Sequence, residues 1–243
     1  MEKRKVRMNE KSTLKKTKSV YALIIAPHPD DAEFGIAGTV AKWVKEGKQV
    51  VYAICTNGDK GTSDPNIKPE DLAKIREKEQ QAAAKVLGVQ EVVFLRFPDQ
   101  GLEDTTEFRK ELVRQIRIFK PEVVCTCDPY RRYIWHRDHR ITGQVVLDAV
   151  FPYARDIHAF ADLAAEGYAT HKVKEVWLWG SPDVNHKEDI SATFEQKIAA
   201  LKCHRSQFDV EEMEKRMRER YRALADKTDF QYAETFHREQ IWR

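Results

Sequence analysis

A histidine and two adjacent aspartates occupy one short turn near the start of the chain, and such side chains bind metals or move protons. Residues 27–31 read Pro-His-Pro-Asp-Asp, which places His28, Asp30 and Asp31 within four positions. An apolar run of buried-strand type precedes the turn, and a helical pattern follows it. The two prolines fix φ at their own positions and bias the residues before them to extended conformations. The stretch therefore predicts half of a metal site in a stiff strand-to-helix turn.

A second group of the same residue types follows an apolar run later in the chain. His136, Asp138 and His139 fall within four positions at the predicted start of a helix. A helix N-terminus disfavours a charged imidazolium, and neutral imidazole is the form that ligates metal. Taken singly, each group also fits a structural role, as a turn or helix cap with a surface histidine.

The order of the predicted elements brings the two groups together. Strands alternate with long helices, which predicts an α/β fold, a Rossmann-like three-layer α/β/α arrangement with a mostly parallel sheet. In a doubly wound sheet the first and fourth strands can be neighbours, and ligands bind at the carboxyl ends where the strand order reverses. We expect strands at 20–26, 49–55, 91–95, 123–127 and 174–179, and helices at 32–46, 70–87, 105–119, 138–153, 189–205 and 211–225.

Two imidazoles and one carboxylate suit Zn²⁺ with an open position for water. The remaining carboxylate, Asp30, would take a proton from that water as a general base. His136 would hydrogen-bond the developing oxyanion or protonate a leaving amine, with Asp138 orienting its ring. These roles together are typical of amide hydrolysis.

Length and charge divide the chain of 243 residues into a tail and one domain. Residues 1–19 carry eight Lys or Arg against two Glu, so the tail is +6 and the remaining chain is −3. We expect a basic disordered tail at 1–19 and a single domain at 20–243, with a C-terminal helical extension from about residue 209. Contact of this tail with nucleic acid or anionic lipid is the less favoured alternative.

Several classes of protein are excluded by composition. No run of about 18 apolar residues predicts a membrane span, and the tail lacks the apolar region of a secretory signal. Four cysteines in a chain of this length do not indicate a disulfide framework. We therefore expect a cytoplasmic protein that does not bind membranes.

At its two acidic and histidine-rich motifs the chain resembles the LmbE-like or PIG-L zinc deacetylases, over about residues 20–208. This family includes GlcNAc-PI de-N-acetylase and the mycothiol, bacillithiol and diacetylchitobiose deacetylases. Weaker similar pieces are the loop at 56–61, Arg76 with Glu79, Asp99-Gln-Gly-Leu, and the segment from His204 to Gln207.

The resemblance implies one Zn²⁺ per subunit held by His28, Asp31 and His139. It implies Asp30 as the general base and His136 as the oxyanion stabiliser or acid. Arg76 would contact the substrate, the alternative being a solvated helix cation. His204 would lie near the site, and a trimer or hexamer is implied.

The chain departs from the family pattern around its second motif. Trp135 stands where many relatives have glycine, and Ile134 stands where some have a tyrosine that assists the carbonyl. Trp135 would stack on a sugar face or pack in the core or a subunit contact. Asp59 occupies a position where glutamate is frequent. These departures concern the substrate pocket more than the metal.

We expect a zinc-dependent hydrolase that removes an acetyl group from an N-acetylated amino sugar or its conjugate. One alternative is a zinc amidase that acts on a non-sugar or thiol-conjugate substrate. Another is a nucleotide-binding module without catalysis, which is weakened because no Gly-x-Gly-x-x-Gly motif follows the first strand.

Overall fold

The computed structural model describes residues 19–241, and the basic tail predicted at 1–19 falls almost wholly outside them. A seven-stranded sheet forms the centre of the fold, in the order β3-β2-β1-β4-β5-β7-β6. Its strands are β1 (Ala22–Ala26), β2 (Val50–Thr56), β3 (Glu91–Phe97), β4 (Val123–Cys127), β5 (Glu175–Trp179), β6 (His186–Asp189) and β7 (Ala233–Gln240). The predicted α/β fold with a mostly parallel sheet is confirmed, since only the pairings of β7 are antiparallel.

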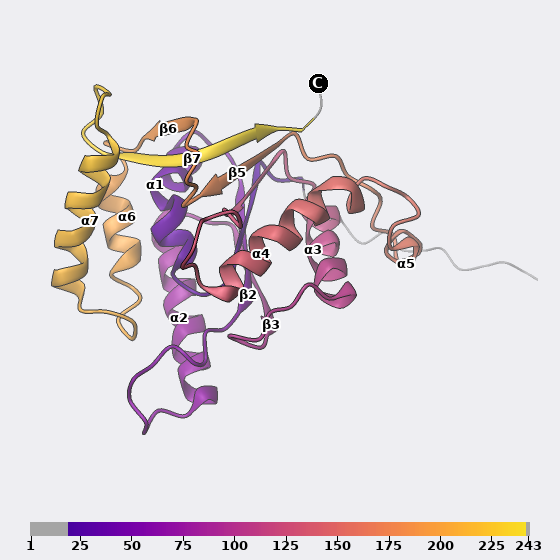
Figure 1. The fold of residues 1–243 in the computed structure, drawn as a ribbon, viewed down its shortest axis with the longest axis horizontal. Helices are drawn as coiled ribbons and strands as arrows, with labels where there is room; N and C mark the ends of the chain where they lie inside the picture. Colours follow the sequence, from indigo (N-terminus) through magenta and orange to yellow (C-terminus); the bar gives the residue numbers. More distant parts are fainter. Residues whose placement is uncertain (1–18, 242–243) are drawn as a thin grey trace, which may run out of the picture.

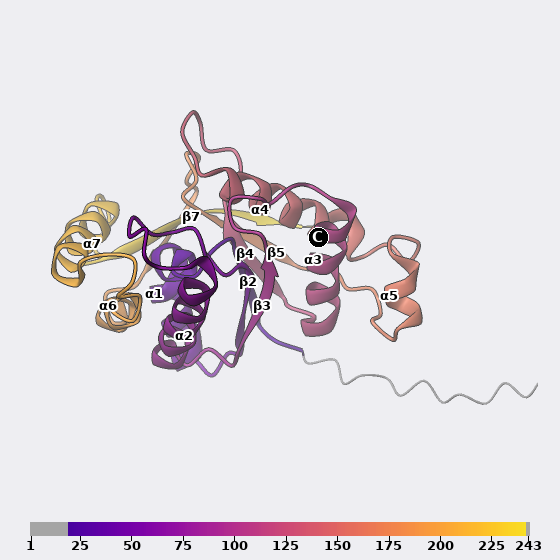
Figure 2. The same ribbon diagram turned by 90° about the horizontal axis from the view of Figure 1, so that it is seen from below.

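Helices cover both faces of the sheet, with α1, α2 and α6 on one side and α3 and α4 on the other (Figure 2). Successive residues of β1 point to opposite faces, so Ile24 packs on the α1 side and Ile25 on the α3 side. The helices are α1 (Asp31–Lys45), α2 (Pro69–Leu87), α3 (Thr106–Phe119), α4 (Arg137–Asp148), α5 (Ala161–Ala165), α6 (Phe194–Leu201) and α7 (Val210–Leu224), and a π-helical turn, η1 (Ala149–Tyr153), continues α4. No helix within the described residues is long and apolar enough to cross a bilayer.

Strands β1 and β4 are neighbours, and this pairing positions the site. Their register aligns residues 22–24 with residues 123–125, so the two strands run level and parallel. The strand order reverses at this point, with β2 and β3 on one side of β1 and the later strands beyond β4. The loops that carry the two predicted motifs therefore leave adjacent strands at the same edge of the sheet.

The C-terminal part differs from the prediction of a helical extension from about residue 209. Helix α7 is present, but it is followed by β7, which inserts into the sheet between β5 and β6. The helix predicted at 189–205 is also too long, because β6 extends to Asp189 and α6 begins only at Phe194.

A buried ion pair fastens β7 to helices α1 and α6. Lys197 and Glu234 are fully buried, with Nζ and Oε1 at 2.7 Å. Glu234 accepts hydrogen bonds from the backbone N–H groups of Gly38 and Thr39 at 2.9 and 2.8 Å, and from the Thr39 hydroxyl. Lys197 donates to the carbonyl oxygen of Glu33 at 2.8 Å. Every charge in this group has partners, so the pair is costly to break from one side.

The substitution Glu234→Ala leaves the Lys197 ammonium buried without its counter-charge and removes the acceptor of three hydrogen bonds. We expect the free energy of unfolding to fall by about 3–5 kcal/mol, measured by urea denaturation. Glu122→Ala is the matched control, because the Glu122–Lys174 pair is exposed to solvent and its loss costs no more than about 1 kcal/mol. Equal effects of the two substitutions would contradict the proposed importance of burial.

Candidate metal and catalytic site

The turn between β1 and α1 separates its two adjacent aspartates by an unusual backbone conformation. Asp30 has φ 88° and ψ −27°, in the left-handed region that residues other than glycine rarely adopt. Its N–H donates to Oε1 of Gln80 on α2 at 3.0 Å. The left-handed conformation turns the chain between Asp30 and Asp31, so the two carboxylates face different partners. Backbone strain of this kind is retained mainly at functional sites.

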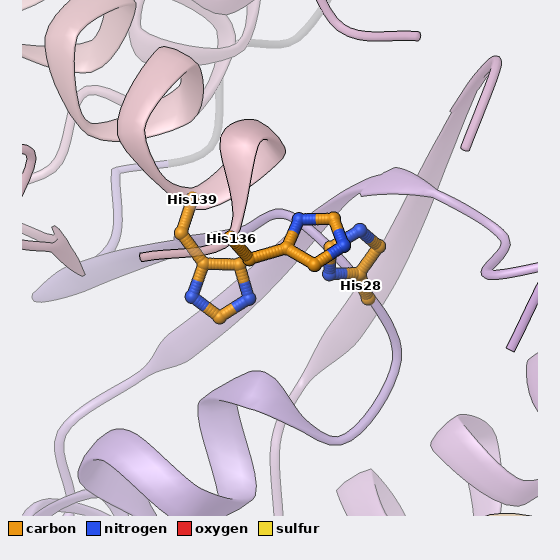
Figure 3. Close-up of side chains that lie close together, drawn as sticks. All are labelled: His28, His136 and His139. Carbon is orange, nitrogen blue, oxygen red and sulfur yellow. The ribbon is translucent and has the colours of Figure 1, made fainter. Parts of the chain in front are cut away.

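The three histidines of the two motifs converge between this turn and the start of α4 (Figure 3). The ring centroids of His28 and His136 are 4.7 Å apart, and His139 lies 5.3 and 5.4 Å from them. Their ligand nitrogens lie within 4.8 Å of one another. His136 caps α4, and its Nδ1 accepts the backbone N–H of Asp138 at 3.1 Å.

The carboxylate of Asp31 contacts one histidine from each of the two motifs. Its Oδ2 lies 3.0 Å from Nδ1 of His28, and its Oδ1 lies 3.1 Å from Nε2 of His139. The backbone N–H of His28 also donates to Asp31, at 2.9 Å. The three predicted metal ligands are thus brought together in the structure, although they come from loops more than 100 residues apart in the chain.

The carboxylate of Asp138 contacts His28, which corrects the expectation that it orients the ring of His136. His28 Nε2 lies 3.2 Å from Oδ2 of Asp138 and 3.2 Å from Oδ1 of Asp99. Asp138 also accepts the N–H of Gln100 at 2.7 Å, whereas only its own backbone N–H reaches His136. Carboxylates that accept from the far nitrogen of a histidine are a common arrangement behind metal-ligating imidazoles.

The charges around His28 favour a bound cation. Burial alone would lower the pKa of His28, but hydrogen bonds to Asp138, Asp31 and Asp99 raise it to about 11. Burial opposes ionisation of Asp31, yet His139 and His28 hold its pKa below the usual value. Asp99 likewise keeps a low pKa of about 2 through its contact with His28, against the effect of burial. A site with this excess of carboxylate stabilises positive charge.

The donors present fit a zinc ion. Nδ1 of His28 and the carboxylate of Asp31 face each other, and His139 completes a set of two imidazoles and one carboxylate. Nδ1 of His139 is buried and makes no hydrogen bond within the described residues. A second cluster, formed by His28 with Asp99 and Asp138, also has metal-binding spacing. Backbone N–H groups already occupy both of those carboxylates, at Lys60 and Gln100, so we assign them to the support of His28.

One carboxylate oxygen of Asp30 contacts a buried guanidinium. Arg76 donates to Oδ2 of Asp30 at 3.1 Å and to the carbonyl oxygens of Pro29 and Gly58 at 2.7 and 2.9 Å. Gly58 has φ 64°, and a Cβ there would collide with this guanidinium. Arg76 is 4% exposed, so the alternative of a solvated helix cation is wrong, and its contact with substrate stays a prediction. Arg76 is the counter-charge of Asp30.

The pKa of Asp30 suits proton transfer near neutral pH. Burial, followed by the charge of Asp31, raises it to about 7, while Arg76 acts in the opposite direction. A general base works best when its pKa lies near the operating pH. Asp30 and Asp31 are adjacent, and yet their pKa values are displaced in opposite directions.

Buried polar side chains lie behind the Asp30 turn, and hydrogen bonds join the first two of them, Gln80 and Glu33. Gln80, whose Oε1 accepts the Asp30 N–H, donates through Nε2 to Oε1 of Glu33 at 2.9 Å. Nε2 of His204 lies 3.3 Å from Oε2 of Glu33. Because His204 is fully buried, it supports the turn, and the predicted contact with substrate is wrong. The sequence prediction omits Gln80, although it lies one helical turn after Arg76 and therefore on the same face of α2.

Two predicted substrate residues, Trp135 and Asp59, remain, together with Ile134, which stands where some relatives have a tyrosine. Trp135 is half-buried, with its ring edge-on to His139 at 4.6 Å and its Nε1 donating to the carbonyl of Asp128 at 3.0 Å. Asp59 is half-buried, and its Oδ1 has no hydrogen-bond partner in the part of the chain that is described. Ile134 is 92% exposed on the β4–α4 loop. Of these three, Trp135 is the one that contacts a predicted metal ligand.

Comparisons with known proteins agree with this geometry. Residues 23–150 match the family described as PIG-L, GlcNAc-PI de-N-acetylase. A diacetylchitobiose deacetylase of Thermococcus kodakarensis is 37% identical over 186 residues, which cover 76% of this chain and 69% of that protein. A probable N-acetyl-α-D-glucosaminyl L-malate deacetylase 2 of Bacillus anthracis is 29% identical, covering 77% and 81%.

A solved structure extends the similarity to the whole described fold. The N,N′-diacetylchitobiose deacetylase of Pyrococcus horikoshii superposes with a TM-score of 0.86 at 30% identity. The superposition covers 96% of this chain and 88% of the other. It therefore includes elements beyond residues 23–150, where the family match ends.

The contact of Asp138 with His28 predicts an effect on metal affinity. Asp138→Asn keeps the shape of the side chain but weakens the acceptor behind the imidazole, and we expect zinc affinity to fall by about 10–100-fold. Competition with a chromophoric chelator measures it. Asp128→Asn is the control, since Asp128 is also buried but accepts the Tyr130 N–H instead. Unchanged zinc affinity in Asp138→Asn would show that the carboxylate does not support the ligand.

Proposed function

Since the chain belongs to the PIG-L family of de-N-acetylases, we propose that it is a zinc-dependent hydrolase that removes the acetyl group from an N-acetylated amino sugar or its conjugate. The observation that carries the proposal is that the two adjacent aspartates of the first turn have different partners. Asp31 is placed between His28 and His139, while Asp30 pairs through one oxygen with Arg76. One carboxylate is thus available to hold a metal and its neighbour to move a proton.

We assign the metal to His28, Asp31 and His139. Zn²⁺ held there would lower the pKa of water and polarise the acetamide carbonyl. Asp30 accepts the proton of the attacking water and then passes it to the amine nitrogen as the C–N bond breaks, which releases acetate and the free amino sugar. Its pKa of about 7 serves both steps, because the group must bind and release the proton in each cycle.

His136 would stabilise the carbonyl oxygen as negative charge develops. Its Nδ1 accepts the Asp138 N–H, so the proton of the neutral ring resides on Nε2, which is the nitrogen free to donate. Burial, followed by the charges of His28 and His139, lowers the pKa of His136 and favours this neutral form. A neutral donor acts through a hydrogen bond to the oxyanion. This geometry favours oxyanion stabilisation over the alternative role of general acid.

The substitution Asp30→Asn separates proton transfer from metal binding. We expect acetate release to fall by about 10²–10⁴-fold, with the zinc content measured by elemental analysis remaining near one per chain. Asp71→Asn, an exposed aspartate on α2 that pairs with Lys74, is the control and retains full activity. An Asp30→Asn enzyme with undiminished activity contradicts the assignment of the base.

A substrate panel tests the reaction itself. The zinc-loaded protein is incubated with N-acetylglucosamine, its 1-O-conjugates and diacetylchitobiose, and acetate and free amine are quantified by liquid chromatography. An N-acetylated thiol conjugate and a simple non-sugar acetamide are included. Hydrolysis confined to the last two would replace the amino-sugar substrate with the amidase alternative. No hydrolysis of any compound would remove the proposed function.

A further inference from the structure

A cavity of about 230 Å³ opens directly beside two of the proposed metal ligands. Asp31 and His139 form its inner end, and Trp135 and Trp179 supply aromatic walls. Its outer part is lined by Arg131 of the β4–α4 loop and Arg220 of α7. The cavity connects the reacting centre with a helix that lies outside the part of the chain matching the family model.

The two arginines of this cavity have no carboxylate partner. Neither Arg131 nor Arg220 forms an ion pair or hydrogen bond with any residue between 19 and 241. Arg218, two positions earlier on α7, shows the usual arrangement, with ion pairs to Glu195 and Glu214 at 2.6 and 2.5 Å. Two free guanidiniums on one small cavity are notable because residues 20–243 have a net charge of −3.

The negative charge that lines the cavity is already paired with histidines. Its one carboxylate is Asp31, which is placed between His28 and His139. The charge that remains for a ligand to meet is therefore positive. It lies on the outer side of the cavity, away from the position of the acetamide at the histidines.

The guanidinium of Arg131 is positioned by stacking on Trp135, with its hydrogen-bond donors free for a ligand. This guanidinium lies 4.3 Å from the ring centroid of Trp135, and that indole is fixed by its hydrogen bond to the Asp128 carbonyl. Stacking on an aromatic ring leaves the edge of a guanidinium free to donate, and this planar edge matches a carboxylate or phosphate. Trp135 would at the same time offer its indole to the sugar ring that bridges the two ends of the cavity.

We propose that Arg131 and Arg220 form a subsite for an anionic group, a carboxylate or a phosphate, carried by the amino-sugar substrate. The proposal rests on the deacetylase function and specifies the class of conjugate. The acetamide would lie at His139 and Asp31, and the anion would lie between the β4–α4 loop and α7. Charge-assisted bonds to arginine are stronger than bonds between neutral groups, so the subsite would select charged over neutral conjugates.

Three glycosides of N-acetylglucosamine test the subsite: the neutral methyl glycoside, the carboxymethyl glycoside and the 1-phosphate. We expect kcat/KM for an anionic compound to exceed that for the methyl glycoside by roughly tenfold or more. Arg131→Gln and Arg220→Gln should each lower this ratio about tenfold, mainly through KM, because the contact is equal in the ground and transition states. A preference for only one of the two anions identifies whether carboxylate or phosphate is the natural group.

Two neighbouring arginines provide matched controls. Arg132→Gln removes an exposed charge from the same loop, and Arg216→Gln removes one from the same helix, yet neither side chain lines this cavity. Both variants should keep the wild-type ratio. Equal kcat/KM for all three glycosides in the wild type, or a preference that survives in the double Arg131→Gln, Arg220→Gln variant, overturns the subsite.

Direct binding distinguishes failure of the subsite from failure of the proposed function. Calorimetry on the zinc-loaded protein compares N-acetylglucosamine 1-phosphate and the carboxymethyl glycoside with the methyl glycoside, whether or not any of them is hydrolysed. Tighter binding of an anionic compound that is lost in Arg220→Gln and kept in Arg216→Gln supports the subsite. Equal binding of all three compounds, or a preference unaffected by Arg220→Gln, removes it even if deacetylation is observed.

Discussion

The parallel pairing of β1 with β4 is the constraint on which the site depends. Backbone hydrogen bonds hold the two strands level, so the loops that follow Ala26 and Cys127 leave the sheet together. The distances from His28 and Asp31 to His139 follow from that pairing, because the first two residues follow β1 and the third follows β4. The helices that follow these strands pack on opposite faces of the sheet, which leaves the space between the loops open.

The charges and hydrogen-bond donors around each aspartate then determine its protonation state and its role in the site. Asp99 and Asp138 take hydrogen bonds from backbone N–H groups and from His28, so their negative charge is stabilised without a metal. Asp31 lies against two imidazoles and has a low pKa. Asp30 is buried beside that charge with Arg76 as its counter-ion, and its pKa is raised. Four aspartates of one chemical type are thus distinguished by what surrounds each of them.

The parts of this site that are local in sequence could be predicted, and those that depend on packing between distant elements could not. His28 and Asp31 sit in a strand-to-helix turn that the apolar periodicity reveals. The burial of Arg76 was not predictable in this way, because its partners are a carbonyl at Gly58 and a carboxylate on another loop. Motif context alone predicts that His204 lies near the site, and such context carries no information on whether a side chain faces the cavity or the core.

Strand β7 shows the same limit at the level of the fold. Its sequence, Ala-Glu-Thr-Phe-His-Arg-Glu-Gln, contains few apolar residues, so periodicity does not distinguish it from a loop. It becomes a strand because it pairs with β5 on one side and β6 on the other. Glu234 within it also accepts hydrogen bonds from the backbone of α1 and from the ammonium of Lys197. The same ammonium bonds the carbonyls of Glu33 and Phe34, in the first turn of α1. Strand β7 is therefore tied to the helix that begins at Asp31, and the C-terminal region supports the proposed metal-binding turn as well as one wall of the cavity.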